Sequence, residues 1–171
     1  MNHEEVDKMP TGPAARMGDL TAHGGPLVPG PPSFNVIMGG QPAWLGMTAA
    51  AAAALAATIA AGAKNVAEKT AQATAAAAAG PAASAAAQAD LADATAKAAS
   101  DTASAMTASG VSMNACPIVK LLVPDGIGVV ILPSQTVLIN HWGACRVGDM
   151  IQEVTSVNAI AQGLPTVIIG G

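Results

Sequence analysis

Aromatic side chains are almost missing from this sequence, whose 171 residues include one phenylalanine, two tryptophans and no tyrosine. Apolar residues make up 51% of the chain, but many of them are alanine, so any core has to be thin and aliphatic. Charged residues are also scarce, at 11%, and the formal net charge is −4. Because no basic stripe is present to neutralise phosphates, the composition argues against a nucleic-acid partner.

Cysteine is scarce as well, since Cys116 and Cys145 are too few for a disulfide framework. Free thiols or a metal ligand are the states expected in a reducing compartment. The sequence begins Met1-Asn2-His3-Glu4-Glu5, which is acidic and lacks the apolar run of a secretory signal peptide. We therefore expect a cytoplasmic protein after synthesis, one that leaves the cell, if at all, by a route other than general export.

A short repeated motif organises the residues that are present. It reads Pro13-Ala14-Ala15-Arg16-Met17-Gly18-Asp19, returns as Gly143-Ala144-Cys145-Arg146-Val147-Gly148-Asp149, and appears in weaker form as Pro42-Ala43-Trp44-Leu45-Gly46-Met47. A strand-like run precedes each of the two later copies, and a third such run, Val167 to Gly171, ends the chain. Because the first copy lacks a preceding run and the last run lacks a following copy, the pattern is cyclic. It predicts that the two chain ends lie close together.

Glycine and proline dominate residues 13–46, and short β-branched runs dominate residues 111–171. Prolines that fix φ and remove a donor exclude a helix in the first of these segments. We predict strands over Phe34–Met38, Val119–Val123, Val129–Leu132, Val137–Ile139 and Val167–Ile169, with turns at Pro124-Asp125-Gly126 and Pro133-Ser134. The polar residues 1–12 are expected to form a flexible arm.

Residues 47–110 differ sharply from the rest, because they are nearly all small and rich in alanine. Alanine has the highest helix propensity, so we predict helices over Met47–Ala79 and Ala82–Ala108, separated by the break Gly80-Pro81. Two such helices form an αα-hairpin, inserted into an interrupted repeat whose halves are Leu45–Met47 and Val111–Met113. The uncharged run Met47–Ala63 falls short of the ~20 residues of a typical membrane span, so we expect no crossing.

The repeated motif resembles the PAAR-repeat family, small bacterial proteins that cap the spike of type VI secretion systems and related contractile injection machines. The resemblance covers about residues 10–46 and 111–171. It is carried by Pro13–Asp19, Thr21–Gly25 and Ala115–Pro117. It implies a mainly β fold, a pseudo-threefold three-sided cone or prism of short strands, which the helical hairpin at 47–110 interrupts.

The resemblance also implies a function without catalysis. The base of the cone would dock through exposed strand edges on a trimeric VgrG-like spike protein, one copy per trimer, and the point would aid puncture of the target membrane. The helical insertion would contact an effector, an adaptor or a chaperone. An alternative is the N-terminal targeting region of a PAAR-type toxin effector, whose alanine-rich helices bind a chaperone. In both cases the protein is expected in the bacterial cytoplasm before the machine fires. A third and weaker interpretation is a metal-dependent hydrolase.

Members of this family carry zinc near the point of the cone, held by three histidines and one cysteine. His23 and Cys116 match two of these ligand positions. The other two positions fall near Met113 or Asn114 and near Pro124-Asp125, where only Asp125 could supply a ligand suited to zinc. His23 as a hydrogen-bonding loop residue and Cys116 as a small buried residue remain alternatives to zinc binding.

The remaining chemically interesting residues have structural interpretations. Because Arg and Asp recur together with the strands, the motif residues are expected to be elements of the fold and not catalytic groups: Pro13, Ala14, Ala15, Arg16, Gly18, Asp19, Arg146, Gly148 and Asp149. Cys145 replaces an alanine of the motif and is expected to be a buried thiol. His141 is expected in an exposed turn. No nucleophile has the base, the orienting group and the oxyanion site that catalysis needs, so we expect no enzyme.

Overall fold

The computed structural model describes residues 10–28, 30–120 and 123–171. About 38% of the structure is helical and about 31% lies in strands, which form several small antiparallel sheets and no closed barrel among the described residues. The expectation of a mainly β chain is therefore not confirmed, because two helices of 28 residues each outweigh many short strands. Most of the predicted arm and part of the predicted strand Val119–Val123 lie outside the described residues, but Gly12 belongs to a strand.

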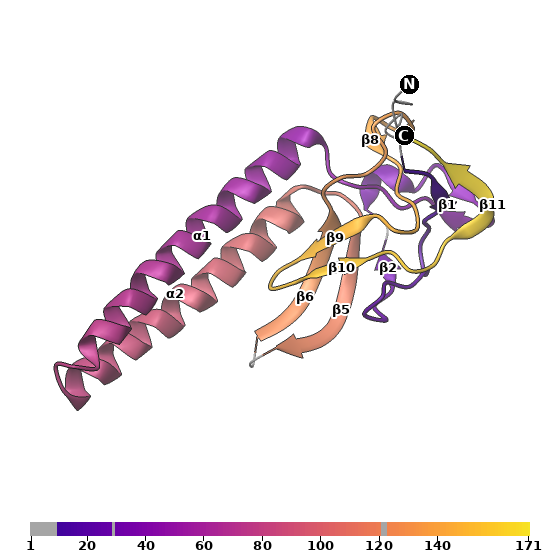
Figure 1. The fold of residues 1–171 in the computed structure, drawn as a ribbon. Helices are drawn as coiled ribbons and strands as arrows, with labels where there is room; N and C mark the ends of the chain where they lie inside the picture. The colour runs from indigo at the N-terminus through magenta and orange to yellow at the C-terminus, as the bar shows by residue number, and fades with distance from the viewer. Residues whose placement is uncertain (1–9, 29, 121–122) are drawn as a thin grey trace, which may run out of the picture.

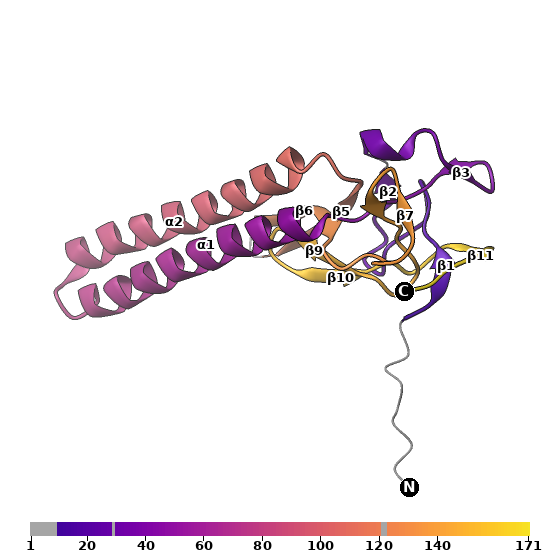
Figure 2. The ribbon, with the colours of Figure 1, turned by 90° about the horizontal axis from the view of Figure 1, so that it is seen from above.

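The two predicted helices are present as α1 (Ala49–Ala76) and α2 (Pro81–Ala108). The Thr48 hydroxyl accepts a hydrogen bond from the backbone N–H of Ala51 and so caps the start of α1. Gly80, with a φ of 113°, makes the tight break before Pro81. The helices lie side by side and project from the β body as a long arm (Figures 1 and 2). By length and composition alone, α1 could cross a membrane. The sequence predicted no crossing, because only the shorter uncharged run Met47–Ala63 was considered.

The β body contains one sheet of five strands and three two-stranded ladders. The sheet has the order β10 (Val157–Ala159), β9 (Met150–Glu153), β6 (Val123–Val130), β5 (Met113–Lys120) and β2 (Leu27–Val28). The ladders are β3 (Ile37–Met38) with β4 (Gln41–Pro42), β7 (Leu138–Ile139) with β8 (Trp142–Gly143), and β1 (Gly12–Ala14) with β11 (Leu164–Ile169). A single 3-10 turn, η1 (Pro31–Ser33), occupies part of the segment from which helices were excluded.

The predicted turn at Pro124-Asp125-Gly126 is wrong, because these residues lie inside β6. Their partner strand β5 shifts register between Cys116 and Val119, and this irregularity lets the β5–β6 ladder continue past them. The consequence for the site is direct, since Asp125 becomes a strand residue beside Cys116 in place of a turn residue at the surface.

The first and last described strands meet, in agreement with the cyclic pattern, because β1 pairs with β11 and Gly12 lies opposite Ile169. The other two ladders are closed by two-residue turns, Gly39-Gly40 and Asn140-His141, in which every residue has a positive φ. Such turns match the twist of the strands that they join. The β1–β11 ladder is therefore the counterpart of these hairpins, with the chain ends in place of the turn.

The three motif copies bond to one another in closed rings. The N–H of Ala15 donates to the carbonyl of Cys145 at 2.9 Å, that of Cys145 to Trp44 at 3.0 Å, and that of Trp44 to Ala15 at 2.9 Å. A second ring, two residues further along each copy, joins Met17 to Pro42, Gly46 to Gly143 and Val147 to Pro13. Within each ring, every copy donates to one neighbour and accepts from the other, and the direction is reversed in the second ring. The three copies therefore make the same set of bonds.

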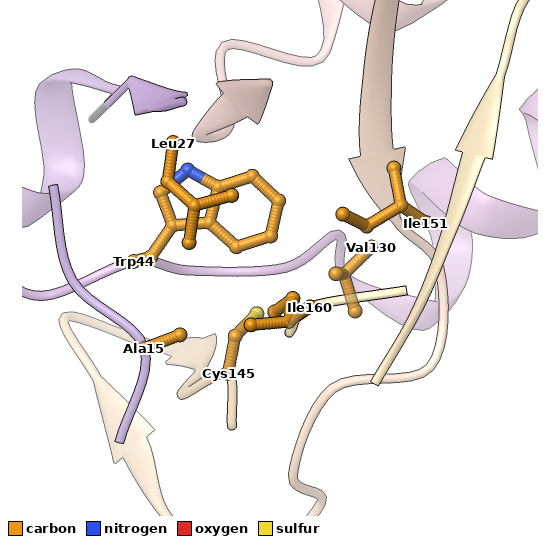
Figure 3. Close-up of a cluster of buried hydrophobic side chains, with 7 residues drawn as sticks. All are labelled: Ala15, Leu27, Trp44, Val130, Cys145, Ile151 and Ile160. Atoms are coloured by element: carbon orange, nitrogen blue, oxygen red, sulfur yellow. The ribbon is translucent and has the colours of Figure 1, made fainter. Parts of the chain in front are cut away.

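The side chains of the three residues of the first ring belong to the inner core (Figure 3). The cluster consists of Ala15, Leu27, Trp44, Val130, Cys145, Ile151 and Ile160. Trp44 is fully buried, and the small side chains at its two ring partners, Ala15 and Cys145, leave room for the indole. The indole N–H donates to the carbonyl of Val28 at 3.0 Å. One aromatic residue therefore fills a core that is otherwise aliphatic.

Two of the three copies carry an Arg–Asp pair that closes the turn after the ring. Asp19 accepts hydrogen bonds from the backbone and the guanidinium of Arg16, and Asp149 does the same for Arg146. The third copy has Leu45 and Thr48 at these two places. Because Thr48 caps α1, the helical hairpin enters at the residue where the other copies have the aspartate.

Candidate metal centre

Four potential metal ligands from different parts of the chain lie close together at the five-stranded sheet. They are His23, Cys116, Asp125 and Glu153, and one potential ligand atom from each lies within 4.8 Å of all the others. His23 follows the first motif copy, and Glu153 ends β9 after the copy at 143–149. Cys116 and Asp125 lie in β5 and β6, which follow the copy at 42–47 and its helical insertion. Each of the three equivalent units therefore contributes at least one ligand.

The contacts of His23 converge on a single ring nitrogen. Its Nδ1 lies 3.0 Å from Oε2 of Glu153 and 3.5 Å from Sγ of Cys116. A catalytic relay from cysteine through histidine to a carboxylate would need one ring nitrogen for each neighbour. Because both neighbours face the same nitrogen, this arrangement does not support such a relay. The same placement would let one cation contact the nitrogen, the oxygen and the sulfur.

Glu153 is fully buried, yet its pKa lies below the ordinary value. Burial by itself raises the pKa of this carboxyl, but hydrogen bonds with Ser156, Asn158, Cys116 and Asn114 favour the ionised form and prevail. Ser156 donates to Oε2 at 2.7 Å, and the amides of Asn158 and Asn114 donate to Oε1 at 2.9 and 3.1 Å. The structure therefore holds a fixed carboxylate at the centre of the cluster.

The other two donors, Asp125 and Cys116, are also buried. Asp125 is buried and accepts a hydrogen bond from the hydroxyl of Thr155. Burial, followed by the negative charges of Glu153 and Asp125, raises the pKa of the Cys116 thiol. A bound cation reverses this effect, since metals bind cysteine as the thiolate and displace its proton. Without a cation, Cys116 is a protonated thiol and a poor nucleophile.

The sequence identified three of the four residues. His23 and Cys116 lie together as proposed, and Asp125, named as a candidate oxygen ligand, lies with them. Glu153 was missed, although one signal was present, since it sits two residues after the buried Ile151 and therefore on the inward face of a strand. The resemblance placed one histidine ligand near Met113 or Asn114. Asn114 hydrogen-bonds Glu153 and is not part of the cluster, and Met113 packs against a hydrophobic cluster. Cys145 is in the core and His141 is in an exposed hairpin turn, as expected.

The residues present fit a divalent transition metal. One imidazole nitrogen, one sulfur and two carboxylate oxygens are donors that such an ion accepts, and four donors suffice for a closed structural site. The cluster could therefore hold a metal ion. Comparisons with models of protein families, with curated proteins and with solved structures found no match for this chain.

Proposed function

We propose that this chain is the pointed tip protein of a contractile injection machine of the type VI secretion class. In this proposal the three equivalent units form a pseudo-threefold, three-sided cone, and one copy caps the end of a trimeric VgrG-like spike. The two closed rings of hydrogen bonds support the proposal, because they give a single chain three equivalent sides. A chain with three such sides matches a threefold partner without needing three copies of itself.

The observation that carries the proposal is a set of three exposed apolar side chains. Ile37, Leu138 and Ile168 occupy the same position in the three ladders, opposite Pro42, Gly143 and Pro13. Their exposed fractions are nearly equal, at 55%, 57% and 60%. Single exposed apolar side chains are common on protein surfaces, so it is their repetition at one position of each ladder that supports an interface with a threefold partner. A trimeric spike end offers three identical sites to receive them.

We also propose that zinc joins the three units at the end of the β body that carries the four potential ligands. His23, Cys116, Asp125 and Glu153 would hold it, and its role would be structural, since its binding free energy adds to the stability of the fold. A narrow end with little core gains most from such an ion, because few apolar contacts are available there. The tip would then resist the load that puncture of a target membrane places on it.

Binding of a cognate trimeric spike protein tests the docking proposal. The variants Ile37→Asp, Leu138→Asp and Ile168→Asp are each expected to weaken binding at least about tenfold, since each places a charge in an apolar contact. The triple variant is expected not to bind. Val157→Asp is the matched control, because Val157 is also exposed, at 52%, but lies in the edge strand β10. Affinity of the triple variant equal to that of the wild type would show that the ladders are not the docking surface.

A second candidate is the targeting region of a toxin effector whose helices are bound by a chaperone. The observation in its favour is α1, which is apolar enough to cross a membrane and would need protection in the cytoplasm if it did so. Grooves of about 240 and 400 Å³ run between α1 and the β body and are lined by Leu55, Ile59 and Val66 among others. A gene that encodes a further domain after Gly171 would favour this candidate.

A further inference from the structure

Two buried asparagines hold one oxygen of the Glu153 carboxylate. Asn114, in β5, and Asn158, in β10, both direct their amide nitrogens to Oε1, at 3.1 and 2.9 Å. Both side chains are almost completely buried, and neither belongs to the group of four potential ligands. Oε1 is thus held from two sides, whereas Oε2 accepts from the Ser156 hydroxyl at 2.7 Å and is the oxygen that faces Nδ1 of His23.

Asn158 also reaches a second member of the cluster. Its Oδ1 accepts hydrogen bonds from the backbone N–H of His23 at 3.3 Å and from that of Ala159 at 2.8 Å. The two ends of one amide therefore link the backbone of His23 with the carboxylate of Glu153, which come from different units of the fold. This link fixes the spacing between the nitrogen and oxygen donors.

Within the described part of the chain, the side-chain amide of Asn114 is hydrogen-bonded at its nitrogen but not at its oxygen. Its Oδ1 is buried and has no hydrogen-bond partner among the described residues. A buried acceptor left in this way lowers stability, so an apolar residue of similar size would suit a purely structural position better. The position therefore favours the donor that Asn114 presents to Glu153.

We propose that Asn114 and Asn158 are positioning residues that make Glu153 a ligand through one oxygen, Oε2. The inference rests on the metal site of the proposed function and adds what determines its geometry. Binding through both oxygens would require Oε1 to leave its two amide donors, so the site stays four-coordinate, with one nitrogen, one sulfur and two oxygens. Partners outside the ligand shell of this kind orient the ligands and raise metal affinity.

The test uses the full chain, stripped of metal and titrated with Co²⁺ and with Zn²⁺ against a competing chelator. Asn158→Asp keeps an oxygen for the N–H groups of His23 and Ala159 but loses the donor and repels Oε1. Asn114→Ala removes the other donor without adding charge, and Asn65→Asp, on the exposed face of α1, controls for the change in net charge. We expect Asn158→Asp and Asn114→Ala each to bind Co²⁺ and Zn²⁺ about 10- to 100-fold more weakly than the wild type does. The intense visible absorption of four-coordinate Co²⁺ should also weaken, while Asn65→Asp matches the wild type in both respects.

The outcomes separate this inference from the proposals on which it rests. If both variants bind Zn²⁺ as tightly as the wild type, the asparagines do not position Glu153. If affinity falls only in proportion to the folded fraction measured by circular dichroism, and the Co²⁺ spectrum is unchanged, their role is merely structural and the inference is overturned. If the wild type binds no metal, the zinc site and this inference both fail, while the spike-binding experiment still tests docking.

Discussion

Removal of zinc by a chelator is expected to lower the thermal midpoint of the wild-type protein by roughly 8–16 °C. The reason is linkage, since an ion that binds only the folded state at about a thousand times its Kd adds about 4 kcal/mol to the free energy of unfolding. For a domain of this size, each kcal/mol corresponds to roughly 2–4 °C. The effect should be large here because the ion would join all three units through His23, Glu153 and the Cys116–Asp125 pair. Differential scanning calorimetry with and without added zinc measures it.

His23→Ala is the informative variant for this experiment, because it removes the only nitrogen donor of the cluster. It should lose the zinc-dependent part of the stability and show the same midpoint with and without the ion. His141→Asn is the matched control, since it also removes a histidine but lies in an exposed hairpin turn whose positive φ asparagine tolerates. A wild-type midpoint that does not respond to zinc, or a zinc response retained in His23→Ala, would remove this ion from the proposal.

Trp44→Ala is expected to lower the free energy of unfolding by about 3–5 kcal/mol, the usual cost of removing a large buried aromatic side chain. Trp44 is fully buried, and its neighbours in the ring, Ala15 and Cys145, are too small to fill the space that it leaves. The hydrogen bond from its indole to Val28 is lost as well. Because domains of this kind have only about 5–15 kcal/mol in total, the variant should lose a large fraction of its stability. Urea unfolding followed by circular dichroism gives the value.

Cys145→Ala is the matched control, because it truncates the equivalent position of the same ring and restores the residue found at Ala15. It should cost only about 1 kcal/mol, within the range for small deletions in a core. Burial raises the pKa of Cys145 well above its ordinary value of 9.0. Above pH 9.0 the unfolded chain therefore releases this proton first, and this part of the stability falls as the pH rises. The variant should lack that alkaline loss, and equal costs for Trp44→Ala and Cys145→Ala would contradict the view that the indole fills the core.

The periodic features of the chain could be predicted from the sequence because they are local. Alanine propensity and the Gly80-Pro81 break predicted both helices to within a few residues. The cyclic order of motif and strand predicted that the ends meet, and β1 pairs with β11. The resemblance implies a mainly β chain that a helical hairpin interrupts, whereas the hairpin contributes the two longest elements of the structure.

Features that depend on distant contacts could not be predicted in the same way. Pro124-Asp125-Gly126 has the composition of a turn, yet the segment lies in β6, where it pairs with β5 beside an irregularity of register. Glu153 lies far from His23 and Cys116 in sequence, and it is buried because Ser156, Asn158 and Asn114 solvate its carboxylate. The resemblance implied histidine ligands near Asn114 and Asp125, where this chain has none, and it did not indicate a carboxylate from another unit.

The number of copies bound to a spike is the most direct measurement of whether this chain caps a threefold end. Native mass spectrometry of the purified chain mixed with an excess, and then a deficit, of a cognate trimeric spike protein gives that number. We predict one copy per trimer under both conditions, because one chain already supplies three equivalent sides. Three copies per trimer, or no complex at all, would contradict the proposal.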